Sequence, residues 1–127
     1  MENQIKHLAD NWLKEKYGML TFDDYQFAAQ KTAIYPTEYK LMYPALGLAG
    51  EAGEVANKIK KIIRDGESKM PPDWKEQVAS ELGDVLWYCA ALANDLEIPL
   101  STIAGQNRVK LMERQKNNTL QGSGDNR

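Results

Sequence analysis

The sequence is poor in cysteine and histidine, with only Cys89 and His7 among 127 residues. A single cysteine excludes an intrachain disulfide framework and a thiolate metal cluster. Nothing in the sequence near the lone histidine indicates that it belongs to a Ser-His-Asp triad. The function classes that depend on these two residue types are therefore not indicated.

Long hydrophobic runs are also missing. No apolar run approaches the roughly 20 residues that a membrane helix needs, and the N-terminus lacks the basic and apolar regions of a signal peptide. Sixteen basic and eighteen acidic side chains nearly balance, so a basic patch for a nucleic acid polymer is not indicated. The composition, 43% apolar and 27% charged, predicts a one-domain cytoplasmic globular protein without a membrane partner.

Apolar residues recur at helical spacing along most of the chain. Thr21 with Asp24, and Asp73 with Glu76, have the spacing of capping boxes at helix N-termini. Helices are expected over about residues 2–17, 21–35, 41 or 45 to 64, 73–96 and 101–115. No convincing strand remains, so the predicted fold class is all-α, a helical bundle with a central antiparallel helix pair. The predicted divisions are an N-terminal helical extension over 1–20, a helical domain over 21–116 and a disordered tail over 117–127.

A first acidic edge is expected on the helix that ends near residue 64. With Leu48 set at zero, Glu51, Lys58 and Glu54 fall at about 300°, 280° and 240° on the helical wheel. They lie along one edge of an apolar stripe that Leu48 begins. A single E-x-x-E pair usually marks a solvated face. The small residues around it nevertheless indicate that a helix or a ligand approaches the backbone: Gly47, Ala49, Gly50, Ala52 and Gly53.

A second acidic edge repeats the pattern 30 positions later. With Val78 at zero, Glu81, Tyr88 and Asp84 fall at the same angles of about 300°, 280° and 240°. The short connection favours antiparallel packing, which turns both edges to the same side. Four carboxylates would then repel one another at the border of an apolar core unless a cation neutralised them. Oxygen-only ligands suit Mg²⁺, or Mn²⁺ as a substitute.

At these residues the sequence resembles the MazG-like nucleotide pyrophosphohydrolases of the all-α NTP pyrophosphatase superfamily. Two segments give that family's E-x-x-E…E-x-x-D signature: Gly47-Leu-Ala-Gly-Glu51-Ala-Gly-Glu54 and Glu81-Leu-Gly-Asp84. A third resembles its N-x-x-K-L-x-x-R segment: Asn107-Arg-Val-Lys110-Leu-Met-Glu-Arg114. The resemblance covers about residues 21–114, with all three segments in order on predicted helices.

The resemblance implies hydrolysis of a nucleoside triphosphate, often a deoxynucleotide, to the monophosphate and pyrophosphate. By that reading, Glu51, Glu54, Glu81 and Asp84 bind Mg²⁺. Glu51 and Glu54 are the catalytic candidates, with Glu51 first, to orient or deprotonate the attacking water. Bound metal lowers the pKa of water, so histidine is not required as the base. A deoxynucleotide is expected, with dGTP as the first choice.

Five residues are candidates for binding the substrate. Lys58 would contact phosphate oxygens or pair with Glu54 one turn away. Tyr88 would hydrogen-bond the ligand, and Gln26 has the donor and acceptor needed to read a base edge. Asn107 and Lys110 read as surface from their spacing alone. The resemblance makes them candidates for phosphate or sugar contacts.

Two further expectations concern partners. Trp87 falls at about 180° on its wheel, opposite the seam between the two acidic helices. It therefore needs another partner, either a bundle helix or a second subunit. Trp12 likewise has no assigned packing partner in the predicted bundle. A homodimer or homotetramer is expected. The alternative function is a non-catalytic helical interaction module with an acidic groove. A di-iron bundle is disfavoured because its Glu-x-x-His motifs are absent.

Overall fold

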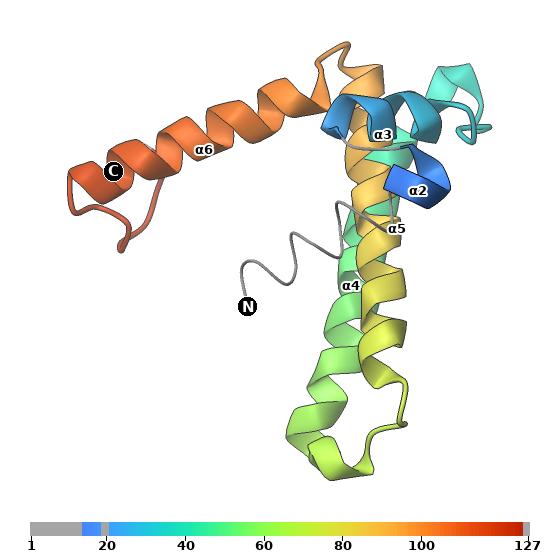
Figure 1. Ribbon diagram of the computed structural model, residues 1–127, viewed down its shortest axis with the longest axis vertical. Helices are drawn as coiled ribbons and strands as arrows, with labels where there is room; N and C mark the ends of the chain where they lie inside the picture. Colours follow the sequence, from blue (N-terminus) through green and yellow to red (C-terminus); the bar gives the residue numbers. More distant parts are fainter. Residues whose placement is uncertain (1–13, 19–20, 126–127) are drawn as a thin grey trace.

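The computed structural model describes residues 14–18 and 21–125 (Figure 1). Its helices are α2 (Lys14–Tyr17), α3 (Phe22–Gln30), α4 (Met42–Asp65), α5 (Trp74–Asp95) and α6 (Leu100–Lys116), with short turns η2 (Thr37–Tyr39) and η3 (Glu67–Lys69). No strand occurs within the described ranges, so the predicted all-α class is confirmed. Most of the helix predicted over residues 2–17 lies outside the described residues, as do Trp12 and His7.

The centre of the fold is an antiparallel pair, α4 and α5, which run side by side along the long axis (Figure 1). α4 is capped by Gly66, whose φ of 86° favours glycine. The Gly66 N–H donates to the Ile62 carbonyl at 2.9 Å. η3 and the two prolines after it then reverse the chain. The predicted antiparallel pair is therefore confirmed by the packing of α4 on α5, which the short connection favours.

One of the two predicted capping boxes is correct. Thr21 has extended backbone angles, and its hydroxyl oxygen accepts the Asp24 N–H at 3.0 Å. The capping box predicted for Asp73 and Glu76 is wrong. Asp73 lies directly before α5 as predicted, but its side chain does not accept a hydrogen bond from the first turn of the helix. Its carboxylate accepts instead from the Gln77 carboxamide one turn later, at 3.1 Å.

α3 crosses α5 near its C-terminal end and forms the core there (Figure 1). The buried cluster consists of Ala29, Ala90, Ala93 and Leu100, with Tyr25 and Trp87 packed against it. Small alanine side chains on α5 allow α3 to approach closely, and larger side chains would hold the helices apart.

Side chains of α3 also fix the start of α6. Pro99 precedes α6 and offers no side-chain cap, so the first backbone N–H groups need acceptors from elsewhere. The Gln26 carboxamide accepts the Leu100 N–H at 2.7 Å and donates to the Ile98 carbonyl at 3.0 Å. Asp23 accepts from the backbone and hydroxyl of Ser101, at 3.0 and 2.7 Å. The direction in which α6 leaves the fold is therefore set by α3.

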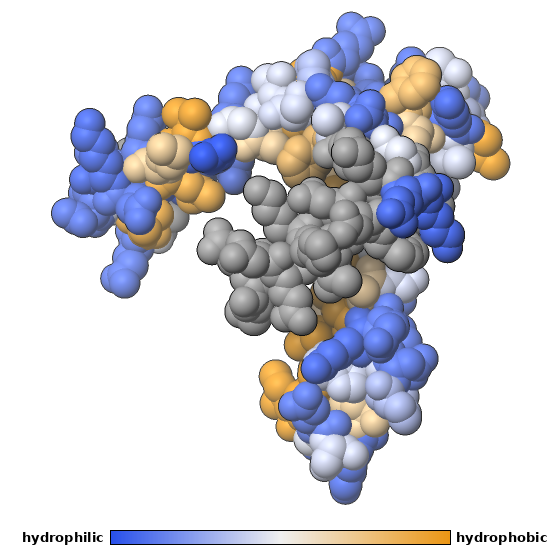
Figure 2. Space-filling view, viewed as in Figure 1, coloured by the Kyte–Doolittle hydropathy of each residue, from blue (hydrophilic) through white to orange (hydrophobic). Residues whose placement is uncertain are grey.

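α6 projects away from the α4–α5 pair as an arm, and the chain after it folds back on the arm's outer end (Figure 1). The Arg114 guanidinium is buried there and donates to the Asp125 carbonyl at 2.9 Å. Figure 2 shows apolar side chains on the outer arm and along one edge of the pair. Ile63 is 88% exposed and Met112 56% exposed. None of the described helices is long and apolar enough to span a bilayer.

Candidate functional site

The two acidic edges meet where α4 faces α5. Glu51 of α4 and Glu81 and Asp84 of α5 form the acidic cluster, in which one carboxylate oxygen from each lies within 4.8 Å of the others. Glu81 and Asp84 share a helix edge because three residues are nearly one turn. The antiparallel pairing brings Glu51 opposite them. The predicted convergence of carboxylates from both helices is therefore present in the structure.

Glu51 is partly buried among other negative charges. Its pKa is raised, first by burial and then by the negative charges of Asp84, Glu81 and Glu54. Both causes penalise the charged carboxylate, and a cation bound among these groups would relieve both. The cluster therefore has the electrostatic character of a cation site.

Glu54 stands apart from the other three carboxylates. It is exposed and is not a member of the acidic cluster, although its charge contributes to raising the pKa of Glu51. Lys58 bridges the two helices, because its Nζ lies 3.2 Å from a carboxylate oxygen of Glu81. Lys58 is thus paired with Glu81 on the neighbouring helix and not with Glu54 on its own helix.

An open cleft of about 380 Å³ adjoins the acidic cluster, and residues of α4, α5 and the segment after α3 line it. It is lined by Thr32, Glu51, Asp84, Trp87 and Tyr88. Two of these residues are carboxylates of the cluster, and two are aromatic. One cleft therefore joins a site suited to a cation with surfaces suited to a flat ring.

Tyr88 fills space that Gly47 leaves open. A Cβ at position 47 would overlap the Tyr88 ring, whereas Cβ atoms at Gly50 and Gly53 would meet nothing within 4 Å. The sequence predicted that something approaches the backbone near these glycines, and at Gly47 it is an aromatic ring from α5. The ring lies beside Glu51, whose charge contributes to raising the pKa of Tyr88 after burial and the neighbouring Tyr43.

Trp87 finds its partner within the same chain. Its indole N–H donates to the Thr32 hydroxyl oxygen at 2.8 Å, and its ring packs against the core cluster. The sequence left two possible partners open, a bundle helix or a second subunit. The observed partner is the turn that follows α3, in the same chain. Trp87 lies edge-on to Tyr88, with ring centroids 5.0 Å apart and planes at 89°.

The connection between α3 and α4 places further aromatic rings next to Tyr88. Tyr35 stacks on Tyr43 with centroids 4.8 Å apart, and Tyr43 lies 6.4 Å from Tyr88. One carboxylate oxygen of Asp95 accepts from the Tyr35 hydroxyl and from the Leu41 N–H, both at 2.9 Å. Burial and this hydrogen bond raise the pKa of Tyr35 to about 12. The sequence analysis missed Asp95, because its partners lie more than 50 residues away.

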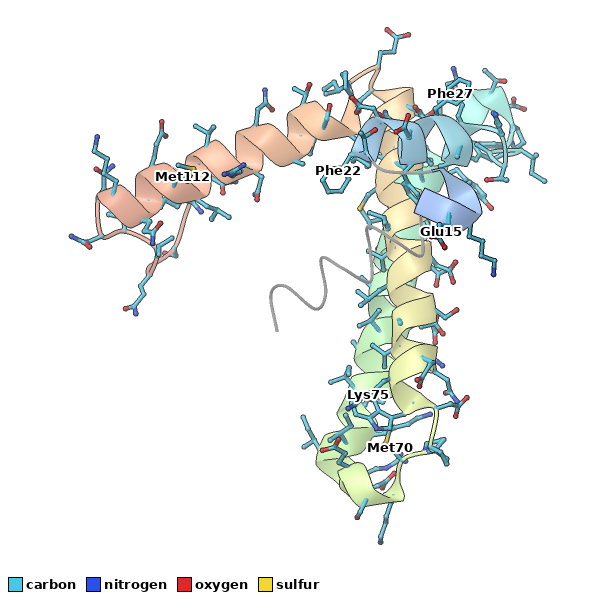
Figure 3. All side chains as sticks on the ribbon, viewed as in Figure 1. Glu15, Phe22, Phe27, Met70, Lys75 and Met112 are labelled. Atoms are coloured by element: carbon cyan, nitrogen blue, oxygen red, sulfur yellow. The ribbon has the colours of Figure 1, made fainter. Side chains whose placement is uncertain are left out.

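The remaining candidates lie away from the acidic cluster. Asn107 and Lys110 are exposed on α6, on the arm that Met112 marks in Figure 3, apart from the α4–α5 pair. Gln26 is buried, with its carboxamide bonded to the α5–α6 connection. It borders a cleft of about 400 Å³ that includes none of the three carboxylates. Substrate contacts by these residues stay predictions.

Comparison with known proteins agrees with this geometry. The MazG nucleotide pyrophosphohydrolase domain matches residues 42–119, which include α4, α5 and α6 and so the whole acidic cluster. The Gene 37 protein of Mycobacterium phage L5 is 48% identical over 111 residues, covering 83% of this chain and 97% of that protein. No solved structure gives a significant match. The chain belongs to the MazG nucleotide pyrophosphohydrolase family.

Proposed function

We propose that this protein is a Mg²⁺-dependent nucleoside triphosphate pyrophosphohydrolase, which converts a (deoxy)nucleoside triphosphate to the monophosphate and pyrophosphate. The observation that supports this most strongly is the acidic cluster of Glu51, Glu81 and Asp84 in a chain of this family. Its carboxylates come from two helices, and two of them, Glu51 and Asp84, line a cleft that could receive a metal-bound polyphosphate.

The donor set fits a hard divalent cation. Mg²⁺ takes oxygen ligands at about 2.0–2.1 Å, so octahedral neighbours lie about 3 Å apart and opposite ligands about 4 Å apart. Carboxylate oxygens within 4.8 Å of one another reach such positions through small side-chain rotations. Glu54, one turn from Glu51 on the same edge, is the proposed fourth carboxylate. Mn²⁺ has the same ligand preference and is the proposed substitute.

When bound, the cation supplies charge neutralisation at the triphosphate and orients it for attack at the α-phosphorus. Glu51 lines the cleft and is the proposed group that accepts a proton from the attacking water, with Glu54 orienting that water. Lys58 is the proposed phosphate contact, because its ammonium group already lies at the acidic cluster. Tyr88 borders the same cleft and is proposed to hydrogen-bond the ligand.

The decisive experiment measures pyrophosphate release from all common and modified (deoxy)nucleoside triphosphates, with Mg²⁺ and with EDTA. Asp84→Asn keeps the shape of the side chain and removes its charge, so we expect pyrophosphate release to fall about 100-fold or more. Glu76→Gln is the matched control, because Glu76 is an exposed acid in the first turn of the same helix. Full activity of Asp84→Asn, or activity in EDTA, would refute this mechanism.

Substrate preference and assembly are proposed separately. dGTP is the first substrate to test, followed by the other deoxynucleotides. A homodimer or homotetramer is supported by the exposed apolar side chains, including Leu46 at 69% and Ile63 at 88%. Isolated exposed apolar residues are ordinary, but apolar patches such as those in Figure 2, on the outer arm and along one edge of the pair, are typical of an interface. Light scattering at several protein concentrations measures the assembly directly.

A further inference from the structure

We propose that the nucleobase of the substrate stacks on Trp87, and that Thr32 is the residue that positions the Trp87 ring. This inference rests on the proposed function and extends it to the part of the substrate that the acidic cluster does not contact. Neither residue was expected to contact the substrate on the basis of the sequence.

The first argument is the placement of the cleft. A nucleoside triphosphate has a polyanionic end, which needs the cation, and a flat aromatic end. The cleft beside the acidic cluster has Glu51 and Asp84 among its lining residues and Trp87 and Tyr88 as its aromatic ones. Its volume of about 380 Å³ lies within the usual range of ligand pockets. A triphosphate held at the carboxylates would therefore have its base near these rings.

The second argument is the fixed orientation of Trp87. Its indole N–H donates to Thr32 at 2.8 Å, and the Thr32 hydroxyl donates in turn to the Ala29 carbonyl at 3.0 Å. The acceptor and donor roles of this hydroxyl are thus both used. Trp87 also packs against the core cluster and remains partly exposed where it lines the cleft. A ring already held in one orientation loses little conformational freedom when a base stacks on it.

The third argument separates Trp87 from Tyr88. The Tyr88 ring is engaged at Gly47 and near Tyr43, and it lies at 89° to the Trp87 ring. The two rings thus meet nearly at a right angle, and the indole of Trp87 is the larger of the two ring systems. Thr32 lies outside residues 42–119, which match the family domain. The residue that fixes the base-binding ring therefore belongs to a segment that precedes the part carrying the carboxylates.

The direct test uses tryptophan fluorescence. The chain has three tryptophans, so Trp12→Phe/Trp74→Phe leaves Trp87 as the only indole. We expect its emission to be quenched by a Mg²⁺-bound α,β-imido deoxynucleoside triphosphate, which resists cleavage at the α–β bridge. Inorganic tripolyphosphate with Mg²⁺ has no base and should leave the emission nearly unchanged. Equal responses to the two ligands, or no response while calorimetry detects nucleotide binding, would overturn the proposal.

Substitutions test the two residues separately. Trp87→Leu should raise KM for the best nucleotide about 10-fold and leave inhibition by tripolyphosphate unchanged. Thr32→Val removes the acceptor of the indole N–H but keeps the side-chain shape, so KM should rise with little change in kcat. Trp74→Phe, at the other end of α5, and Thr102→Val, on α6, are the matched controls. Equal loss of affinity for nucleotide and tripolyphosphate would assign Trp87 a purely structural role.

The outcomes separate this proposal from the proposed function. A wild-type protein that hydrolyses no nucleoside triphosphate refutes the proposed function, whereas the fluorescence titration needs only binding. A protein that hydrolyses nucleotides normally after Trp87→Leu refutes the base-stacking role alone. If Trp87→Leu does not fold, as circular dichroism would show, the fluorescence titration still decides, because the Trp12→Phe/Trp74→Phe variant used there keeps Trp87.

Discussion

The α4–α5 pair and the α6 arm differ in where their side chains find partners. Within the pair each helix supplies partners for the other, as Lys58 does for Glu81 at 3.2 Å. On the arm, the buried cation Arg114 is held by the chain that follows the helix, through the Asp125 carbonyl. Met112 of the arm is 56% exposed. The two helices of the pair thus supply partners for each other's charged side chains, whereas the arm's buried cation is bonded by the segment that follows the arm. Apolar side chains are exposed in both regions, as Ile63 of α4 is at 88%.

This difference decides which of the predicted residues lie together within one chain. Glu51, Glu81 and Asp84 meet because two helices face each other. Asn107 and Lys110 have equally regular spacing but lie on a helix that projects from the fold (Figure 1). Helical spacing places side chains on one face, and a site arises only when a second element faces them. The proposed oligomer would supply that element for the arm.

The largest expected effect on stability contrasts two glycines, one in each region. Gly47→Ala puts a Cβ into the Tyr88 ring, and such overpacking costs about 1–3 kcal/mol. Gly105→Ala, in the middle of α6, meets nothing within 4 Å and should stabilise the protein by about 0.5–1 kcal/mol. Urea unfolding measures both. Equal changes in the free energy of unfolding for the two substitutions would contradict the difference in packing between the α4–α5 pair and the α6 arm.

These glycines also show how far the sequence could predict the fold. Periodicity and a short connection predicted the α4–α5 pair and its acidic edges, because both signals are local. The same signals treated Gly47, Gly50 and Gly53 alike, although only Gly47 faces a ring. Nothing local distinguishes them, since the ring comes from Tyr88 on the next helix.

Long-range hydrogen bonds mark the same limit. The Gln26 carboxamide binds backbone groups of Ile98 and Leu100, more than 70 residues away, while its contact with a base stays a prediction. Asp95 joins Tyr35 and Leu41 across 60 and 54 residues. Polar side chains of this kind satisfy backbone groups that exist only after the helices have packed, so no spacing rule identifies them.

The next prediction tests whether the arm belongs to a site in the assembly. A lysine that contacts phosphate makes a charge-assisted bond worth about 1.5–3 kcal/mol. Lys110→Met should therefore lower kcat/KM by about 10- to 100-fold, if the arm of one copy reaches the cleft of another. Lys116→Met, in the last turn of α6, is the matched control. An unchanged kcat/KM would place Lys110 on a surface without a catalytic role.

A smaller effect is expected from the cation at the seam of the pair. Lys58 and Glu81 have side chains 27% and 20% exposed, so losing their ion pair should cost no more than about 1 kcal/mol. Lys58→Met should lower the melting temperature in EDTA and tighten Mn²⁺ binding, because the ammonium group no longer competes for Glu81. Calorimetric titration with Mn²⁺ measures the second effect.

The control for Lys58 is Lys60→Met. Lys60 lies on the same helix, is exposed and donates to Asn57, so its loss changes the net charge equally without touching the seam. We expect Mn²⁺ affinity to stay near the wild-type value in this variant. The same increase in affinity for both variants would trace the effect to overall charge and not to the pair between Lys58 and Glu81.

The smallest effect concerns the connection between α3 and α4, which Asp95 of α5 holds by hydrogen bonds to Tyr35 and Leu41. Burial and the hydrogen bond to Asp95 raise the pKa of Tyr35 from 10.0 to about 12. The stabilisation from this phenol is thus fully present below pH 10 and is lost as the pH rises towards 12. Tyr35→Phe should be slightly less stable than the wild type below pH 10, and the difference should shrink through this window. Urea unfolding across the window checks it, with Tyr39→Phe, half exposed in η2, as the control. No difference at any pH would mean that Tyr35 stabilises the connection through ring stacking on Tyr43 alone. A difference that stays constant through the window would contradict the raised pKa of the Tyr35 hydroxyl.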